Sequence, residues 1–281
     1  MSEQLISDHE FDKFAEFFYR KTGIKFEKNK RYFVDKRVAE RVNATQSESF
    51  RHYFTMLRFQ ASGEELQKLT NLLTVNETYF MREDYQFRCL IDSMLPDVIS
   101  RHDPEKPIRI WCIPSSSGEE PYSIAMYLLE EWDGIDKWDV ELIASDIDTR
   151  ILETAKRGIY SERSVRNVPA TWKRRYFRDV TGGQQVIEDI RDAVEFTRIN
   201  LSEPADVRTM RNIDIIFCRN LLIYFDDLSR KVAAEYMFEA LSPGGYICLG
   251  HTESMGRISP LYRVKKFPAA IVYQRPLEAK Q

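Results

Sequence analysis

The side chains best placed for chemistry follow a short apolar segment that begins at Ile108 and runs into a loop of small residues. In this loop only Gly118 offers the backbone freedom that a very close approach to a ligand needs, which argues against a pyrophosphate cradle. Glu119 and Glu120 come next, where a phosphate-binding loop would carry neutral or basic groups. The two carboxylates favour a ligand with a cationic group. The alternative is a helix start stabilised by acidic residues, with no ligand.

A further carboxylate, Asp146, ends the apolar segment Val140–Asp146. An acidic residue at the end of the second strand of an α/β sheet is placed to accept hydrogen bonds from a ribose diol. Asp148, two residues later, fits the cap of a helix over Thr149–Arg157. The sequence therefore predicts one acidic binding residue and one structural acidic residue in this segment.

Arginine and amide side chains form the rest of the candidate site. Arg82 ends the segment Asn76-Glu-Thr-Tyr-Phe-Met-Arg82, and its guanidinium has the fork geometry that suits a carboxylate. Asn76 and Thr78 are cap-type residues, so a purely structural cap is the alternative for this segment. Arg219 and Asn220 follow the apolar run Ile213–Cys218, and Asn200 lies at the carboxyl end of another predicted strand.

These residues need a scaffold that brings strand ends together, and the alternation of apolar segments predicts one. Strands are predicted at 108–112, 140–146, 194–201, 213–218 and 246–250, with a closing pair at 263–265 and 270–274. Pro121 fits the first turn of a helix. Leu228, Val232, Tyr236 and Ala240 predict the buried face of a later helix. Strands that alternate with helices favour an open, mainly parallel α/β sheet, which binds ligands at the carboxyl ends of its strands.

The region from Gly158 to Val194 interrupts this alternation. It contains a polar, basic stretch and then Thr181-Gly-Gly183, a hairpin-type turn. An inserted helix and a small antiparallel hairpin are predicted here.

The first part of the chain is different, because Glu10–Leu73 shows helical periodicity throughout. Four or five short helices and no strand are predicted. Between Arg20 and Arg41 nine basic residues stand against three acidic ones, a local charge of +6. This stretch fits a docking surface for acidic helices, with Lys36, Arg37 and Arg41 as its centre, or an ordinary solvated helix surface. Nucleic acid is a weaker candidate, since the stretch is short and the whole chain is acidic.

Composition limits the class of protein. A net charge of −3 over 281 residues is typical of a soluble surface, and no apolar run reaches the roughly 18–20 residues that span a bilayer. The polar start Met1–Glu10 lacks a secretory pattern, so a cytoplasmic protein is expected. Scattered cysteines with no Cys-x-x-Cys pair are expected to be core thiols rather than metal ligands or disulfides. These are Cys89, Cys112, Cys218 and Cys248.

Taken together, these motifs resemble the chemotaxis receptor methyltransferase family known as CheR, over nearly the whole chain. The matching segments, in the family's order, are Asn76-Glu-Thr-x-Phe-x-Arg82, Gly118-Glu-Glu-Pro-Tyr-Ser-Ile-Ala125, Ala144-Ser-Asp-Ile-Asp148, Asn200-Leu201, Phe217-Cys-Arg-Asn-x-x-Ile-Tyr-Phe225 and Gly250-His-x-Glu253. The resemblance implies an all-α domain over residues 1–75, a linker with a cofactor-contacting motif over 76–107, and a Rossmann-like methyltransferase domain over 108–281. A small antiparallel β-subdomain is expected as an insertion at about 158–193.

The resemblance also implies an activity, namely methyl transfer from S-adenosylmethionine to glutamate side chains of chemoreceptors. It places a set of residues at the cofactor: Asn76, Thr78, Arg82, Glu120, Asp146, Asn200, Leu201, Arg219 and Asn220. Tyr224 would stand near the methyl group, so Arg82, Arg219 and Tyr224 are the expected catalytic residues. Glu120 is favoured over Glu119, although spacing alone does not choose. Met81 and Pro114 depart from the family's usual residues.

The chemistry of the cofactor agrees with these residues. Glu120 suits its amino group, Asp146 its ribose diol, and Arg82 a carboxylate of cofactor or substrate. A glutamate nucleophile is already ionised at neutral pH, so no general base and no metal site are expected. A nicotinamide or flavin enzyme is disfavoured because no Gly-x-Gly-x-x-Gly follows the first strand. A non-catalytic adaptor of the same fold is the remaining alternative.

Receptor contacts are expected to lie in the helical domain. Some family members capture a receptor's C-terminal pentapeptide as an added strand on the β-subdomain. Here the hairpin turn is short, so no such tether is expected. A monomer without nucleic acid or membrane insertion is expected.

Overall fold

The amino-terminal lobe forms because aromatic and aliphatic residues recur at helical spacing, and their buried faces meet in one core. Phe14 and Phe18 of the first helix are fully buried there beside Val34 and Val38 of the second. Ser7 and Glu10 form a capping box that fixes where the first helix begins. The prediction of four or five short helices is confirmed: α1 (Asp8–Thr22), the 3₁₀ helix η1 (Lys28–Lys30), α2 (Arg31–Ala44), α3 (Phe50–Phe59) and α4 (Glu64–Leu73).

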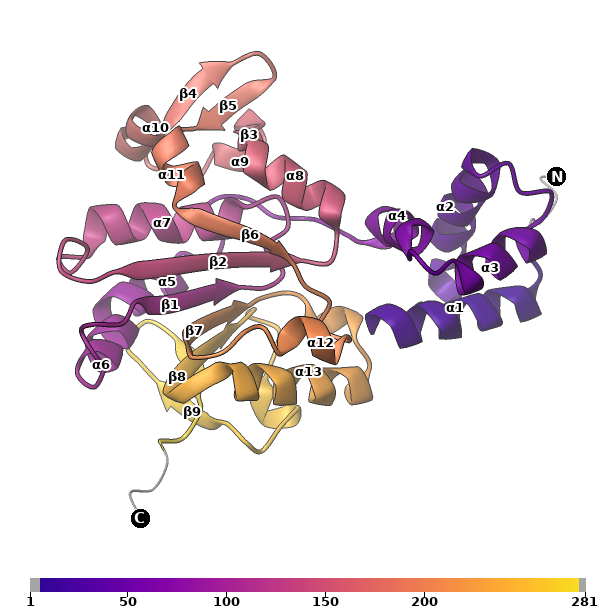
Figure 1. The fold of residues 1–281 in the computed structure, drawn as a ribbon. Coiled ribbons are helices and arrows are strands. Elements are labelled where there is room, and N and C mark those ends of the chain that lie inside the picture. Colours follow the sequence, from indigo (N-terminus) through magenta and orange to yellow (C-terminus); the bar gives the residue numbers. More distant parts are fainter. Residues whose placement is uncertain (1–5, 278–281) are drawn as a thin grey trace.

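The structure, a computed structural model, describes residues 6–277, and Figure 1 shows α1–α4 as a lobe beside a larger α/β domain. The expectation of a start without a secretory pattern rests partly on residues 1–5, which lie outside the described range. Within that range, no helix is both long enough and apolar enough to cross a bilayer.

A single helical stretch links the lobe to the sheet. It consists of α5 (Tyr85–Cys89), a π-helical turn η2 (Leu90–Met94) and α6 (Leu95–Ile99). Pro96 lacks an N–H, so it cannot bond to the carbonyl of Asp92, and the helix widens just before it.

The central sheet has seven strands in the order β6-β2-β1-β7-β8-β10-β9. Its strands are β1 (Ile108–Cys112), β2 (Val140–Asp146), β6 (Val194–Arg198), β7 (Ile213–Cys218), β8 (Leu241–Leu249), β9 (Arg263–Lys266) and β10 (Ile271–Gln274). The first five are parallel, and β10 and β9 close one edge in antiparallel pairing. The predicted strands are present, but two bounds differ markedly: β6 ends at Arg198, before Asn200, and β8 begins at Leu241 rather than at Tyr246. The strand order reverses between β1 and β7, which is where such sheets bind ligands.

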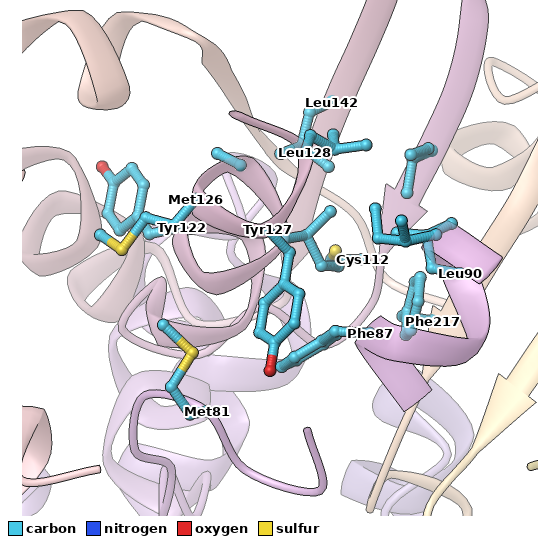
Figure 2. Close-up of a cluster of buried hydrophobic side chains, with 14 of the residues drawn as sticks. Met81, Phe87, Leu90, Cys112, Tyr122, Met126, Tyr127, Leu128, Leu142 and Phe217 are labelled. Atoms are coloured by element: carbon cyan, nitrogen blue, oxygen red, sulfur yellow. The ribbon is translucent and has the colours of Figure 1, made fainter. Parts of the chain in front are cut away.

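Helices cover both faces of this sheet. α7 (Glu119–Glu131) packs with α5 and α6 on one face, and α12 (Pro204–Val207) and α13 (Asp227–Ala240) pack on the other, while α8 (Thr149–Arg157) contacts β2 and β6. Figure 2 shows the first of these cores, where Phe87 lies against Tyr127 at 5.4 Å and Phe217 at 6.0 Å between ring centroids. The core therefore holds the linker helix and α7 to the middle of the sheet.

The predicted buried face of α13 is only partly correct. Ala240 is buried as predicted, but Leu228 is 65% exposed, and the helix also buries Ala233, Ala234 and Met237. Small side chains let this helix lie close to the sheet, a preference that hydrophobic spacing alone does not reveal.

The insertion is richer than predicted. It forms a three-stranded antiparallel sheet in the order β3-β5-β4, with three short helices around it. Its elements are β3 (Ile159–Tyr160), α9 (Glu162–Val165), α10 (Ala170–Tyr176), β4 (Phe177–Val180), β5 (Gly183–Val186) and α11 (Glu188–Asp192). The hairpin is confirmed, but the expectation of a single helix is corrected. β3 has two residues, too few to show alternation in a sequence.

Candidate active site

A cavity of about 510 Å³ lies where the loops after β1, β2, β6 and β7 meet the amino-terminal lobe. This volume falls within the roughly 300–1,000 Å³ of small-molecule sites. Every residue predicted for the site lines this cavity: Asn76, Thr78, Arg82, Glu120, Asp146, Asn200, Leu201, Arg219, Asn220 and Tyr224. The fold thus brings together side chains that are up to 148 positions apart in the sequence, counting from Asn76 to Tyr224.

Asp146 anchors two loops at the bottom of the cavity. Its carboxylate accepts the backbone N–H of Ser116 at 2.8 Å and that of Asp148 at 2.9 Å. Only 3% of the residue is exposed, and this burial raises the pKa of Asp146 to about 6. A carboxylate can accept more hydrogen bonds than these two, so Asp146 keeps capacity for a ligand hydroxyl.

The two glutamates at the start of α7 point in different directions, because successive helical residues are rotated by about 100°. Glu120 lines the cavity, whereas Glu119 accepts hydrogen bonds from Ser117 at 2.6 Å and Ser164 at 2.8 Å, toward the insertion. Burial raises the pKa of Glu120 to about 7, against the opposing effect of the guanidinium of Arg219. The geometry thus favours Glu120, in line with the resemblance to the CheR family.

Arg219 ties three segments together at the end of β7. It donates to Glu120 at 2.8 Å and to the backbone carbonyl of Arg82 at 2.6 Å, and it lies 3.4 Å from Glu83. Its side chain is 3% exposed. An arginine buried this deeply needs such partners, so Arg219 fixes the relative position of α7, the linker and β7.

Arg82 and Tyr224 lie closer to solvent at the same cavity. The guanidinium of Arg82 donates to the carbonyl of Glu77 at 3.1 Å and lies 5.7 Å from the ring centre of Tyr79. Tyr224 is 38% exposed. These side chains are placed to meet a substrate that enters from outside.

Two predicted amides also hold the site's framework. Asn76 donates to Asp148 at 2.9 Å, and Asp148 in turn caps α8 through the N–H of Ile151. Asn200 donates to the backbone carbonyl of Lys21 at 2.7 Å and so joins the loop after β6 to the amino-terminal lobe. Asn76 thus supports a helix cap without forming one, and it also lines the cavity.

Strained backbone surrounds the cavity. Four non-glycine residues here have positive φ: Met81 at 60°, Glu83 at 53°, Ser116 at 49° and Asn220 at 59°. Each such residue costs on the order of 1–3 kcal/mol, and such residues gather at functional sites. The peptide bond between Ile113 and Pro114 is cis.

Sequence reasoning missed the contribution of the amino-terminal lobe to the cavity. Seven of its residues line it: Thr22, Ile24, Lys25, Phe26, Lys30, Phe33 and Leu73. Ile24, Lys25 and Phe26 lie between α1 and η1, where no periodicity marks a buried side chain. The only signal in the sequence was the basic charge of this stretch, which was interpreted as a docking surface.

Comparison with known proteins gives the site its family. Residues 9–74 match the CheR methyltransferase all-alpha domain, and residues 76–271 match the CheR methyltransferase SAM binding domain, where SAM is S-adenosylmethionine. The chain belongs to the CheR methyltransferase family. It is accordingly an S-adenosylmethionine-dependent methyltransferase, as the resemblance predicted.

Relatives cover the chain from end to end. Chemotaxis protein methyltransferase 2 of Vibrio cholerae is 53% identical over 281 residues, 100% of this chain and 97% of the relative. A protein of the same name from Pseudomonas aeruginosa is 38% identical over 90% of this chain and 89% of the relative. The chemotaxis protein methyltransferase of Escherichia coli is 33% identical over 94% of this chain and 91% of the relative. These names give no support to the non-catalytic adaptor.

The residues of the CheR-family cavity fit this cofactor. Ser115 Oγ, Ser116 Oγ and Arg219 Nε are buried and lack a hydrogen-bond partner within residues 6–277. Together with the carboxylates of Glu120 and Asp146, they offer both donors and acceptors to a ligand with an amino group, a carboxylate and a ribose.

Proposed function

We propose that this methyltransferase esterifies glutamate side chains on the cytoplasmic helices of chemoreceptors. The observation that carries the proposal is one cavity lined by two largely enclosed carboxylates, Asp146 at 3% and the Glu120 side chain at 13% exposed, with Arg82 and Tyr224 nearer to solvent. A site of this form suits a cationic cofactor inside and a carboxylate substrate outside.

The carboxylates at the base would hold the cofactor. Glu120 would bind its amino group and Asp146 its ribose hydroxyls, because a charged acceptor makes stronger hydrogen bonds than a neutral one. The bound S-adenosylmethionine supplies a methyl group on a sulfonium, which becomes a thioether when a carboxylate oxygen attacks the methyl carbon and the S–C bond breaks. S-adenosylhomocysteine is the product.

The chain's own catalytic contribution would be orientation. Arg82 would hold the substrate carboxylate, Tyr224 would contact the reacting groups, and Arg219 would keep Glu120 and the linker in place. No proton has to move, since a glutamate with an ordinary pKa near 4.3 is already ionised at pH 7.

Receptor recognition would involve the exposed part of α2. Lys36 is exposed, and Arg37 lies over the ring of Phe33 at 4.7 Å. Arg41 is removed from this surface: it binds Glu65 through two hydrogen bonds of 2.8 Å, and its side chain is only 17% exposed. The expected docking role of Arg41 is therefore corrected to a structural one.

We propose a cytoplasmic monomer that engages receptors without a pentapeptide tether. Four free, buried cysteines suit a reducing compartment.

The decisive experiment is methylation of a purified chemoreceptor cytoplasmic fragment with S-adenosylmethionine that carries a radioactive methyl group. Label is expected on the receptor, and mild alkali should release it as methanol because a glutamyl methyl ester hydrolyses easily. Replacing the labelled glutamates by alanine should abolish incorporation. Alkali-stable label would contradict the glutamate ester, and absence of label would contradict the proposed substrate.

A further inference from the structure

A glutamate outside the cavity holds the loop that delivers two of the candidate catalytic residues. Glu253 follows β8, and its carboxylate accepts the backbone N–H groups of Asn220, Leu222 and Gly250, each at 2.8 Å. Asn220 and Leu222 belong to the loop after β7, which continues to Tyr224. Glu253 itself does not line the cavity.

The contact is closely packed. A Cβ atom added at Gly250 would lie 2.8 Å from Glu253 Oε2 and 2.8 Å from Asn220 Nδ2, shorter than real side chains allow. Asn220 has a φ of 59°, so the loop passes through a strained conformation at the point where Glu253 binds it. The interaction therefore fixes a backbone shape that the loop would not otherwise prefer.

The chemistry requires a carboxylate. Both oxygens of Glu253 accept backbone N–H groups, Oε2 from Asn220 and Gly250 and Oε1 from Leu222. A glutamine amide has one acceptor oxygen and one donor nitrogen, so either orientation would turn a donor toward a backbone N–H. Within residues 6–277, no basic side chain forms an ion pair with Glu253, so the backbone groups are what stabilise its charge.

We infer that Glu253 is a positioning residue for methyl transfer, which acts by holding the 220–224 loop so that Tyr224 faces the reacting groups. This inference rests on the proposed function. Arg219 is held independently by Glu120, Glu83 and the carbonyl of Arg82. Loss of the Glu253 contacts should therefore displace the Tyr224 end of the loop more than the cofactor end.

The test is the substitution Glu253→Gln, measured with a receptor cytoplasmic fragment and S-adenosylmethionine. The kcat should fall by roughly 10- to 100-fold, since small displacements of positioned groups reduce rates on this scale. The affinity for S-adenosylhomocysteine, measured by calorimetry, should stay within about threefold, as expected when ground-state binding is retained.

A matched control lies near the start of β7, at the end of this strand opposite to the 220–224 loop. Asp214, near the start of β7, is also a buried carboxylate that accepts a backbone N–H, from Arg109 at 2.9 Å. Asp214→Asn should lower the midpoint of thermal unfolding and leave kcat unchanged. A purely structural role for Glu253 would make the two variants behave alike.

The possible results are distinct. If Glu253→Gln keeps a kcat within twofold of the unmodified chain, or loses activity only in proportion to cofactor affinity, the positioning role is overturned. If Glu253→Gln does not fold, Gly250→Ala decides instead. Its added methyl group would displace the same carboxylate and should lower kcat in the same way. An unchanged kcat in Gly250→Ala would also overturn the positioning role. If the unmodified chain itself fails to methylate the receptor, the proposed function fails, and the positioning role with it.

Discussion

At the scale of single residues, the site contains two carboxylates whose burial disfavours the ionised form. The pKa of Glu120 rises to about 7 and that of Asp146 to about 6, mainly because both are removed from water. For Glu120, whose ordinary pKa is 4.5, the folded state binds the proton more tightly than the unfolded state. Its stabilising contribution is therefore complete below about pH 4.5 and is lost as the pH rises to about 7.

The affinity for the cofactor should rise with pH, opposite to the contribution of Glu120 to stability. The ionised carboxylate is the form that binds an amino group, so affinity should increase by about tenfold as the pH rises from about 6 to 8 through the pKa. Calorimetry with S-adenosylhomocysteine over this range measures the effect. The variant Glu120→Gln should bind more weakly and lose this dependence, and an identical pH profile in the variant would show that another group titrates.

Asp146 should contribute to affinity through its charge. The substitution Asp146→Ala removes a buried acceptor, a loss of roughly 1.5–3 kcal/mol, which corresponds to about 10- to 150-fold in Kd. The fold should survive, as circular dichroism can verify. Unchanged affinity for S-adenosylhomocysteine would remove Asp146 from the site, and its hydrogen bonds to Ser116 and Asp148 would then be its whole role.

At the scale of elements, α2 divides its basic residues between two uses. Arg41 faces α4 and pairs with Glu65, which also accepts the hydroxyl of Tyr53 at 3.0 Å. Lys36 and Arg37 lie on a more accessible part of the helix. The helix can therefore stabilise its own domain and still present positive charge to a partner.

The two groups of residues should respond differently to substitution. Arg41→Ala leaves Glu65 buried and unpaired and should destabilise the protein by about 3 kcal/mol in chemical unfolding. Replacing Lys36 and Arg37 by alanine should leave stability nearly unchanged and slow receptor methylation by roughly three- to tenfold at low salt. High salt should remove most of that difference, because it screens exposed charges.

A matched pair of residues controls for net charge. Lys265 and Lys266 lie on the edge strand β9, and Lys265 lies over the ring of Phe267 at 5.6 Å, much as Arg37 lies over Phe33. Their replacement by alanine removes the same charge. Equal slowing in this control would contradict a specific docking surface on α2.

The small sheet provides the test of the pentapeptide tether. Its strand β4 forms an open edge of four residues, and only Thr181 and Gly182 separate it from β5. Such a short hairpin offers little side-chain surface to clamp an added strand. Titration of a receptor-tail pentapeptide should give no binding tighter than about 1 mM, or about −4 kcal/mol, whereas micromolar binding would contradict this expectation.

At the scale of the whole molecule, the cavity exists because two lobes meet. Gly23, which ends α1 with a φ of 73°, lies against the methyltransferase domain, and an added Cβ there would lie 2.4 Å from Ser202 Oγ. The backbone N–H of Lys25 bonds to the carbonyl of Tyr224 at 3.3 Å. The amino-terminal lobe thus forms one wall of the cavity.

Gly23→Ala should weaken cofactor binding through this wall. The left-handed backbone costs a non-glycine residue about 1–2 kcal/mol, and the added methyl group also presses the lobes apart. Gly63→Ala is the matched control, since Gly63 has a similar φ of 68° but its added Cβ would contact nothing within 4 Å. Both variants should lose stability, but only Gly23→Ala should weaken binding of S-adenosylhomocysteine. Equal affinities in calorimetry would show that the contact of Gly23 with the methyltransferase domain does not affect cofactor binding.

The sequence by itself determined the strands of the central sheet and the residues at their ends. Nearly continuous apolar runs such as Ile213–Cys218 indicate strands that are buried on both faces, and the carboxyl ends of parallel strands share one rim of the sheet. Motifs that resemble the CheR family then predicted that Arg82, Asp146 and Arg219 belong to one site. These features are local, because they depend on the order of residues along the chain.

Only the tertiary structure decided which partners those residues have. Glu120 rather than Glu119 binds Arg219, Arg41 pairs with Glu65, and Ile24 and neighbouring residues form one wall of the cavity. Each of these contacts joins segments that are far apart in the sequence. The same holds for Glu253, which reaches back 33 positions to Asn220. Hydrophobic periodicity records which side of an element is buried, but it does not record what lies against that side, and this requires the packed molecule.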